Sequence, residues 1–314
     1  MTLPLFDPPP DEGGFDRNAL ASRLRTLAQE GIWIGTSSWK YEGWLGQIYT
    51  RELYSTRGRF SQKKFESECL AEYAQTFPIV CGDFSFYQFP TPQYWQRLFG
   101  SAPERLHFAL KVPEEVTAEV FPKHARYGPR AGIRNESYLN ADALAAMFLE
   151  PLRAYGSRVA VLLFEFGARG AGTREFVDAL DPFLGRLPEG FRYAVEVRNR
   201  EYLQPRYFDC LRARGVAHVL NGWTRMPPLI EQAKLPTPAG FSVVRALLRP
   251  GRAYEDAVAR FQPYNKIGEE NPEARNALRE WIRRMREERR ASYIFVNNRL
   301  EGNAPETIRA VTEG

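Results

Sequence analysis

The run VAVLLFEFG, Val159–Gly167, is almost wholly apolar and ends in glycine. Runs of this kind, rich in Val, Ile and Phe and bounded by polar residues, Pro or Gly, are typical of buried β-strands. The 314-residue chain contains seven more of them. They are Ile32–Ser38, Ile79–Tyr87, Leu106–Pro113, Arg192–Asn199, His218–Trp223, Phe241–Leu248 and Ser292–Asn298. The sequence therefore predicts eight strands.

Helix-like segments lie between several of these strands. Lys63–Phe77 and Ala141–Tyr155 have apolar residues close to helical spacing. Pro272–Arg290 follows Asn271, a good N-cap residue, and has proline at its first helical position. It ends in arginines, which the helix dipole favours at that end. A last short helix is expected to begin near Ala304.

Strands that alternate with helices predict an α/β fold, a single TIM-type (β/α)8 barrel that can be irregular. An open doubly wound sheet is the alternative, but no GxGxxG motif follows the first strand. We expect the barrel to form one domain over residues 31–314. Residues 1–30 are expected to form a flexible tail, rich in Pro and Gly, and a leading segment.

The composition excludes some classes of protein. Lys and Arg number 43 against 38 Asp and Glu, so the net charge of +5 permits an anionic partner without requiring one. Three cysteines without CxxC spacing favour a reduced, cytoplasmic protein and argue against a structural zinc site. No apolar run is long enough to span a membrane, and the N-terminus does not resemble a signal peptide.

Polar residues mark the ends of nearly all the predicted strands. In a TIM barrel the functional site forms at the carboxyl ends of the strands. In chain order the residues at these ends are Asp83, Tyr87, Lys111, Glu165, Glu196, Arg198, Arg245, Asn297 and Asn298. The sequence therefore predicts a polar site at one end of the barrel.

Two charged residues lie on one face of the strand AVEVRN, residues 194–199. Because side chains alternate along a strand, Glu196 and Arg198 point the same way, and buried charges must pair or line a wet cavity. One interpretation is an ion pair, joined by Arg245, that fills the barrel end. The other is a ligand site in which Glu196 is a base or hydrogen-bond acceptor and Arg198 binds an anion. A Glu pKa raised by burial would support the base.

Three further charged residues have two interpretations each. Glu165 lies in an apolar run and needs a partner, either in a site or in a buried pair. Lys111 either holds a phosphate or carboxylate or extends to solvent. Asp83 faces the site or turns outward. If the chain is an enzyme, which the sequence does not decide, we expect Glu196, Glu165 and Lys111 to be its catalytic residues.

Two loops are expected on the same face. GTSSWKYEGWLGQIY, residues 35–49, is rich in glycine and aromatic residues. Its Trp39, Tyr41 and Trp44 are expected to form a wall of the cavity, and the alternative is that the two tryptophans cap the barrel core. The loop Glu114–Asn140 contains several basic residues and is either a lid or a solvated basic surface.

Metal and cofactor motifs are scarce. The three histidines form no HxH or HExxH pattern, which argues against a histidine-based metal centre. A magnesium site built from Asp83, Glu165 and Glu196 is conceivable, but no motif supports it. No GxSxG motif or Walker loop occurs. We expect no cofactor.

Five motifs occur in order along the chain: GTSSWKYEGWLGQIY, FSFYQFP, LHFALKVP, AVEVRN and FVNNRLEGNAP. Together they resemble the YecE-like family, domain of unknown function 72, over about Gly35 to Ala304. The resemblance implies a TIM-type barrel, and the family has no settled activity. The residues that match its motifs are Gly35, Thr36, Ser37, Trp39, Tyr41, Trp44, Phe86, Tyr87, Pro90, Lys111, Glu196, Arg198, Arg245, Asn297, Asn298, Gly302 and Ala304.

Departures from the family pattern indicate a divergent branch. Cys81 and Asp83 stand where many members have Glu-x-Asn, and Glu165 stands where many have Gln. Asn199 follows the strand-five arginine where many members have His. These departures leave open whether this chain and the other family members bind the same ligand.

Three functions fit these residues. The first is binding of, or acid/base action without a redox cofactor on, a small anionic or sugar- or nucleotide-like ligand. Its ligand-binding residues would be Trp39, Tyr41, Trp44, Asp83, Tyr87, Arg198, Arg245, Asn297 and Asn298. The second is nucleic-acid binding through interleaved aromatic and basic residues. The third is a non-enzymatic scaffold or partner protein that docks through the Pro-rich tail and exposed tryptophan. The oligomeric state is not predicted.

Overall fold

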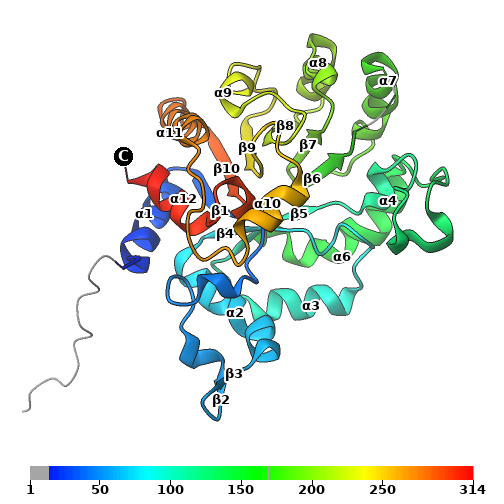
Figure 1. Ribbon diagram of the computed structural model, residues 1–314. Helices are drawn as coiled ribbons and strands as arrows, with labels where there is room; N and C mark the ends of the chain where they lie inside the picture. Colours follow the sequence, from blue (N-terminus) through cyan, green and yellow to red (C-terminus); the bar gives the residue numbers. More distant parts are fainter. Residues whose placement is uncertain (1–13, 169, 171, 314) are drawn as a thin grey trace, which may run out of the picture.

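The computed structural model of the protein describes residues 14–168, 170 and 172–313. Within these residues, eight parallel strands close into a barrel in the order β1-β10-β9-β8-β7-β6-β5-β4, with helices around it (Figure 1). The strands are β1 Ile32–Thr36, β4 Ile79–Gly82, β5 His107–Lys111, β6 Val159–Phe166, β7 Tyr193–Val197, β8 Ala217–Gly222, β9 Phe241–Ala246 and β10 Ala291–Val296. The predicted TIM-type barrel and all eight predicted strands are therefore confirmed.

Most of the predicted helices are also present. They are α2 Gln62–Thr76, α11 Pro272–Glu287 and α12 Ala304–Thr312. The Asn271 side chain caps α11 by accepting a hydrogen bond from the Ala274 amide, as its sequence predicts.

The segment predicted as one helix over Ala141–Tyr155 is irregular instead. It consists of α5 Ala141–Leu144, a π-helical turn η4 Ala145–Leu149, α6 Glu150–Leu152 and a 3-10 segment η5 Arg153–Arg158. Pro151 explains part of this change, because it has no amide hydrogen to continue the α-helical pattern.

The remaining elements cover the barrel or extend from it. The helices are α1 Arg17–Gln29, α3 Pro92–Ser101, α4 Glu114–Thr117, α7 Thr173–Leu184, α8 Pro205–Ala213, α9 Leu229–Gln232 and α10 Tyr254–Phe261. The 3-10 segments are η1 Glu42–Trp44, η2 Arg51–Tyr54, η3 Ala125–Arg130, η6 Arg200–Tyr202 and η7 Asn298–Leu300. A small hairpin, β2 Ser55–Thr56 and β3 Arg59–Phe60, projects away from the barrel (Figure 1).

The leading segment expected before residue 31 contains helix α1. Its Leu20 and Leu24 are fully buried in the main hydrophobic core, and the Asp16 side chain caps its N-terminus. The Pro- and Gly-rich tail expected at the start of the chain falls largely on residues 1–13, outside the described residues. In the part of the chain that the structure describes, no helix is both long and apolar enough to cross a membrane.

Gly35 allows the barrel to close between β1 and β4. It pairs with Ile79, and a Cβ atom at this position would lie 1.9 Å from the Ile79 carbonyl oxygen. Only glycine permits such an approach of two backbones. This requirement accounts for the glycine that begins the GTSSW motif.

The barrel interior changes from apolar to charged toward the carboxyl ends of the strands. Ala109, Leu163, Ala194 and Val243 belong to a buried apolar cluster inside the barrel. Two residues further along each strand stand Lys111, Glu165, Glu196 and Arg245. Because alternate residues share a face, these four charges form the next layer. The backbone thus brings charges from β5, β6, β7 and β9 together.

Candidate functional site

Six of the predicted site residues form one charged cluster at the carboxyl ends of the strands. The charged cluster consists of Asp83, Lys111, Glu165, Glu196, Arg198 and Arg245. Three are cations and three are carboxylates, so their formal charges balance. All except Glu165 and Asp83 are buried. The ion pairs therefore offset much of the free-energy cost of burying these charges inside the barrel.

One oxygen of Glu165 is the centre of the charged cluster. Its Oε2 lies 2.8 Å from Lys111 Nζ, 2.8 Å from Arg245 Nη1 and 3.0 Å from Arg198 Nη2. Its side chain is 16% exposed. Three charge-assisted contacts to a single carboxylate oxygen hold it in place.

Glu196 lies deeper and is held by the two arginines. Its Oε1 lies 2.6 Å from Arg198 Nη2, and its Oε2 accepts a hydrogen bond from Arg245 Nη1. The side chain is 0% exposed. Asp83, which follows β4, is more open and contacts Lys111 Nζ at 3.2 Å and Arg245 Nη2 at 3.8 Å. The predicted Glu196–Arg198–Arg245 ion pairs are therefore present.

The electrostatic environment keeps Glu165 ionised. Burial by itself raises the pKa of its carboxyl, but Arg198, Lys111 and Arg245 outweigh burial and hold the pKa well below its ordinary value. For Lys111, burial lowers the pKa, yet Asp83 and Glu165 raise it by more. The raised carboxyl pKa that would support a base is therefore not found at Glu165, and the nearby lysine stays protonated.

Arg198 is incompletely satisfied. Its guanidinium carbon lies 3.8 Å from the ring centre of Trp223, at the end of the β8 run. Among the described residues, its buried Nε and Nη1 atoms have no hydrogen-bond partner. Trp223 was not predicted as a site residue, although its position after a strand was a usable signal. Arg198 therefore keeps hydrogen-bonding capacity that the charged cluster does not use.

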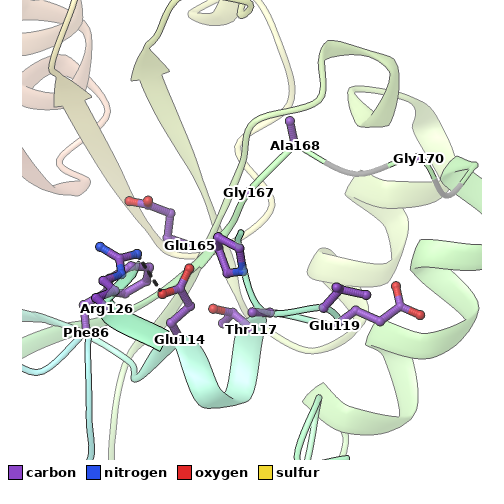
Figure 2. Close-up of a pocket in the computed structure, with 12 residues that line it drawn as sticks. Phe86, Glu114, Thr117, Glu119, Arg126, Glu165, Gly167, Ala168 and Gly170 are labelled. Carbon is purple, nitrogen blue, oxygen red and sulfur yellow. Dashed lines mark hydrogen bonds and ion pairs between the residues drawn. The ribbon is translucent and has the colours of Figure 1, made fainter. Parts of the chain in front are cut away.

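A cavity of about 430 Å³ lies beside the charged cluster. Its lining residues are Phe86, Glu114, Thr117, Ala118, Glu119, Val120, Pro122, Arg126, Glu165, Gly167, Ala168 and Gly170. Figure 2 shows Glu165 near the end of its strand. The Arg126–Glu114 ion pair, 3.2 Å long, lies beside it in the view. Glu165 is the member of the charged cluster in this lining. The cavity thus connects the charged cluster to the loop that follows β5.

The loop Glu114–Asn140 supplies much of the cavity wall. Its arginines pair with glutamates of the same loop, Arg126 with Glu114 and Arg130 with Glu115 at 2.8 Å. The loop therefore lies on the site face, as predicted. Glu114, Thr117 and Phe86 were missed as lining residues, because only tertiary structure brings α4 against the end of β6.

A family model for proteins of unknown function, DUF72, matches residues 33–313. The chain belongs to the DUF72 family. Solved structures of DUF72 proteins from Enterococcus faecalis V583 and Thermotoga maritima MSB8 each match it with a TM-score of 0.61 and 17% identity. Each match covers 90% of this chain, with 94% and 97% of the other chains. At this identity the likeness shows the fold alone, and the search of curated proteins found no match.

The aromatic residues of the first loop mostly pack in the core of this DUF72 protein. Trp44 is 0% exposed, and its Nε1 donates a hydrogen bond to Asn298 Oδ1 at 3.2 Å. Trp39 is buried against Phe84, with ring centres 5.7 Å apart. The prediction that Trp44 forms a cavity wall is wrong, because its ring is enclosed by the protein. The alternative, a cap on the barrel core, describes both tryptophans.

Tyr41, in the first loop, packs against Trp44 of the same loop and against Tyr264, which follows α10. Its ring centre is 4.9 Å from that of Trp44 and 5.5 Å from that of Tyr264. Burial raises the pKa of Tyr41 to about 12, although Arg299 opposes this shift. The Tyr41 hydroxyl is therefore neutral at ordinary pH, and Tyr41 does not line this cavity.

Three other predicted residues of the DUF72 protein lie outside the charged cluster. Asn297 Oδ1 accepts a hydrogen bond from the Arg299 amide and caps η7. Asn298 Oδ1 accepts hydrogen bonds from Trp44 and from the Ala304 amide, at 2.8 Å for the latter. Tyr87 is 54% exposed and stacks under Arg126. The asparagines therefore stabilise local structure, and Tyr87 belongs to the surface near the cavity.

Within the described ranges, no group of three or more His, Cys, Asp or Glu residues could hold a metal ion. The three carboxylates of the conceivable magnesium site, Asp83, Glu165 and Glu196, instead contact Lys111, Arg198 and Arg245. A cation among them would have to displace these side chains.

Proposed function

We propose that this DUF72 protein binds a small anionic ligand, or a sugar- or nucleotide-like ligand with an anionic group, at the charged cluster and the adjoining cavity. Arg198 carries this proposal. Its guanidinium is buried, yet its Nε and Nη1 have no partner among the described residues. A buried donor without an acceptor is costly, and a ligand oxygen would remove that cost.

A purely structural ion network is the competing explanation. Its charges balance, and every carboxylate contacts a cation. Such buried networks contribute little net stability compared with apolar packing, because removing charges from water is costly. Six charges at the strand ends beside a cavity are better accounted for by a ligand, since this is where TIM barrels place their sites.

An acid/base step on the ligand is the second part of the proposal. Glu165 lines the cavity and is ionised, which is the form that accepts a proton, although its lowered pKa makes it a weaker base than a free carboxylate. Lys111 is protonated and lies 2.8 Å from it, where it would stabilise developing negative charge. Glu196 would act by holding the two arginines in place. This chemistry needs no redox cofactor.

A thermal-shift screen tests the proposal. The panel would contain inorganic phosphate, sugar phosphates, nucleotides, carboxylates and divalent metal salts, because a ligand that binds only the folded state raises the melting temperature. We expect one anionic class to stabilise the wild type but not Arg198→Met. Arg153→Met is the matched control, because Arg153 is exposed and pairs only with Glu150 among the described residues. Equal shifts in all three proteins would contradict the proposal.

Nucleic-acid binding is the second candidate, and exposed Tyr87 supports it. Arg126 lies 4.6 Å over the Tyr87 ring at the edge of the cavity, an aromatic and a cation that together could stack a base and hold a phosphate. Oligonucleotide affinity that falls steeply with salt and is lost in Tyr87→Ala would favour this candidate. No binding at low salt would exclude it. The scaffold alternative rests on the Pro-rich tail, which lies outside the described residues, and on an exposed tryptophan, whereas Trp39 and Trp44 are both buried.

A further inference from the structure

We propose that Glu165 is an internal competitor for the anionic ligand and occupies the position of a ligand oxygen until the ligand displaces it. This inference rests on the function proposed above. It also names the ligand group as one that carries two negative charges, such as a phosphoryl group.

The geometry of Glu165 is that of a bound anion. Its Oε2 alone contacts Lys111, Arg198 and Arg245, at 2.8 Å, 3.0 Å and 2.8 Å. An anionic oxygen of a ligand at the same point would make the same three contacts. The two buried donors of Arg198 that lack partners among the described residues would be available to further ligand oxygens.

The two glutamates differ in their freedom to leave. Glu196 is 0% exposed and does not line the cavity, so its carboxylate has nowhere to move. Glu165 is 16% exposed and lines the cavity of about 430 Å³. Lys111, Arg198 and Arg245 do not line this cavity, so a ligand that enters it meets Glu165 before the cations of the charged cluster, and the cavity gives the displaced carboxylate access to solvent. Glu165 is therefore the exchangeable carboxylate and Glu196 the fixed one.

Competition with Glu165 determines which anions bind. A monocarboxylate ligand would replace one carboxylate by another and gain little. A doubly charged phosphoryl group attracts the same three cations more strongly and can therefore displace Glu165. Because only molecules with Glu165 displaced can bind the ligand, the apparent association constant is the intrinsic constant multiplied by the fraction of molecules in that state.

Three variants separate competition from net charge. Glu165→Asp keeps the charge but shortens the side chain, so that it no longer reaches all three cations. Glu165→Gln removes the charge and the competitor. Asp83→Asn removes a negative charge elsewhere in the charged cluster. The Asp83 side chain is 43% exposed and contacts Lys111 and Arg245. Binding of inorganic phosphate and acetate would be measured by calorimetry, at a pH where phosphate is a dianion, after a thermal melt shows that each protein is folded.

We expect Glu165→Gln to bind phosphate about tenfold more tightly than the wild type, as removal of a competitor predicts. Glu165→Asp should also bind more tightly than the wild type, and Asp83→Asn should gain less than Glu165→Gln. A crystal structure of the wild type with phosphate should show the Glu165 carboxylate displaced from Lys111 Nζ.

The inference is overturned, with the proposed function intact, if the wild type binds phosphate and Glu165→Asp binds it equally or more weakly. Equal gains in Glu165→Gln and Asp83→Asn would also overturn it, because net charge alone would explain them. A phosphate complex in which Glu165 keeps its contacts would do the same. If neither the wild type nor any variant binds either anion, the proposed function itself fails.

Discussion

Glu165 and Glu196 are direct neighbours in the barrel, paired across β6 and β7. Like charges opposite each other on parallel strands repel, so this pair needs cations between its members. Arg198 and Arg245 each contact both carboxylates. The two glutamates thus define the place where positive charge must collect at the end of the barrel.

Arg245 should be essential for stability. It is almost fully buried and links Glu165, Glu196 and Asp83. Arg245→Met should lower the free energy of unfolding by about 3–5 kcal/mol, because it removes one of the three cations that balance the three carboxylates of the charged cluster and leaves a buried negative charge uncompensated. Urea denaturation measures the change. The double variant Arg245→Met/Glu196→Gln should recover part of the loss, and failure to do so would show that packing rather than charge explains it.

His218 should make stability depend on pH. Burial lowers its pKa from the ordinary 6.5 to about 3, so the folded protein keeps it neutral. The unfolded chain binds a proton below pH 6.5, and the free energy of unfolding therefore falls as pH drops from 6.5 toward 3. His218→Gln should show a shallower fall in urea denaturation across this range. Parallel curves for the two proteins would contradict the prediction.

Trp44 should affect stability but not ligand binding. Its indole is enclosed and donates to Asn298. Trp44→Phe should cost about 1–3 kcal/mol, because the buried Asn298 oxygen loses a donor and the smaller ring packs less well. Phosphate affinity in the folded variant should match the wild type. A Trp44→Phe variant of normal stability that binds phosphate more weakly would contradict this prediction and make Trp44 part of the ligand site.

Gly35 should tolerate no side chain. A Cβ atom there would clash with the Ile79 carbonyl oxygen, and that atom is backbone and cannot rotate away. Gly35→Ala should therefore open the contact between β1 and β4 and yield little soluble, folded protein. Gly100→Ala is the control, since a Cβ atom at Gly100 meets nothing within 4 Å. A Gly35→Ala protein as stable as this control would contradict the model of closure.

Much of the fold and part of the site could be predicted from the sequence. Apolar runs located every barrel strand, and the position of Glu165 or Arg245 near the end of such a run placed it at the carboxyl end of its strand. The aromatic loop could not be interpreted in this way. Whether Trp44 faces a cavity or the core depends on Asn298, 254 residues away.

The pKa of Glu165 and the lining of the cavity could not be predicted from the sequence either. The sequence shows a glutamate in an apolar run, which alone predicts a raised pKa. The three cations that lower it come from other strands, β5, β7 and β9, or from the residue after them. Tertiary contacts therefore reverse the direction that the local sequence suggests.

Titration of the wild type and Arg198→Met with inorganic phosphate at low salt, by isothermal calorimetry, tests the central claim most directly. An anion site at the charged cluster predicts saturable binding with one phosphate per chain in the wild type. In the folded Arg198→Met variant that binding should weaken by about tenfold or more, because a charge-assisted contact is lost. Phosphate binding of equal affinity in both proteins, or none in the wild type, would contradict the claim.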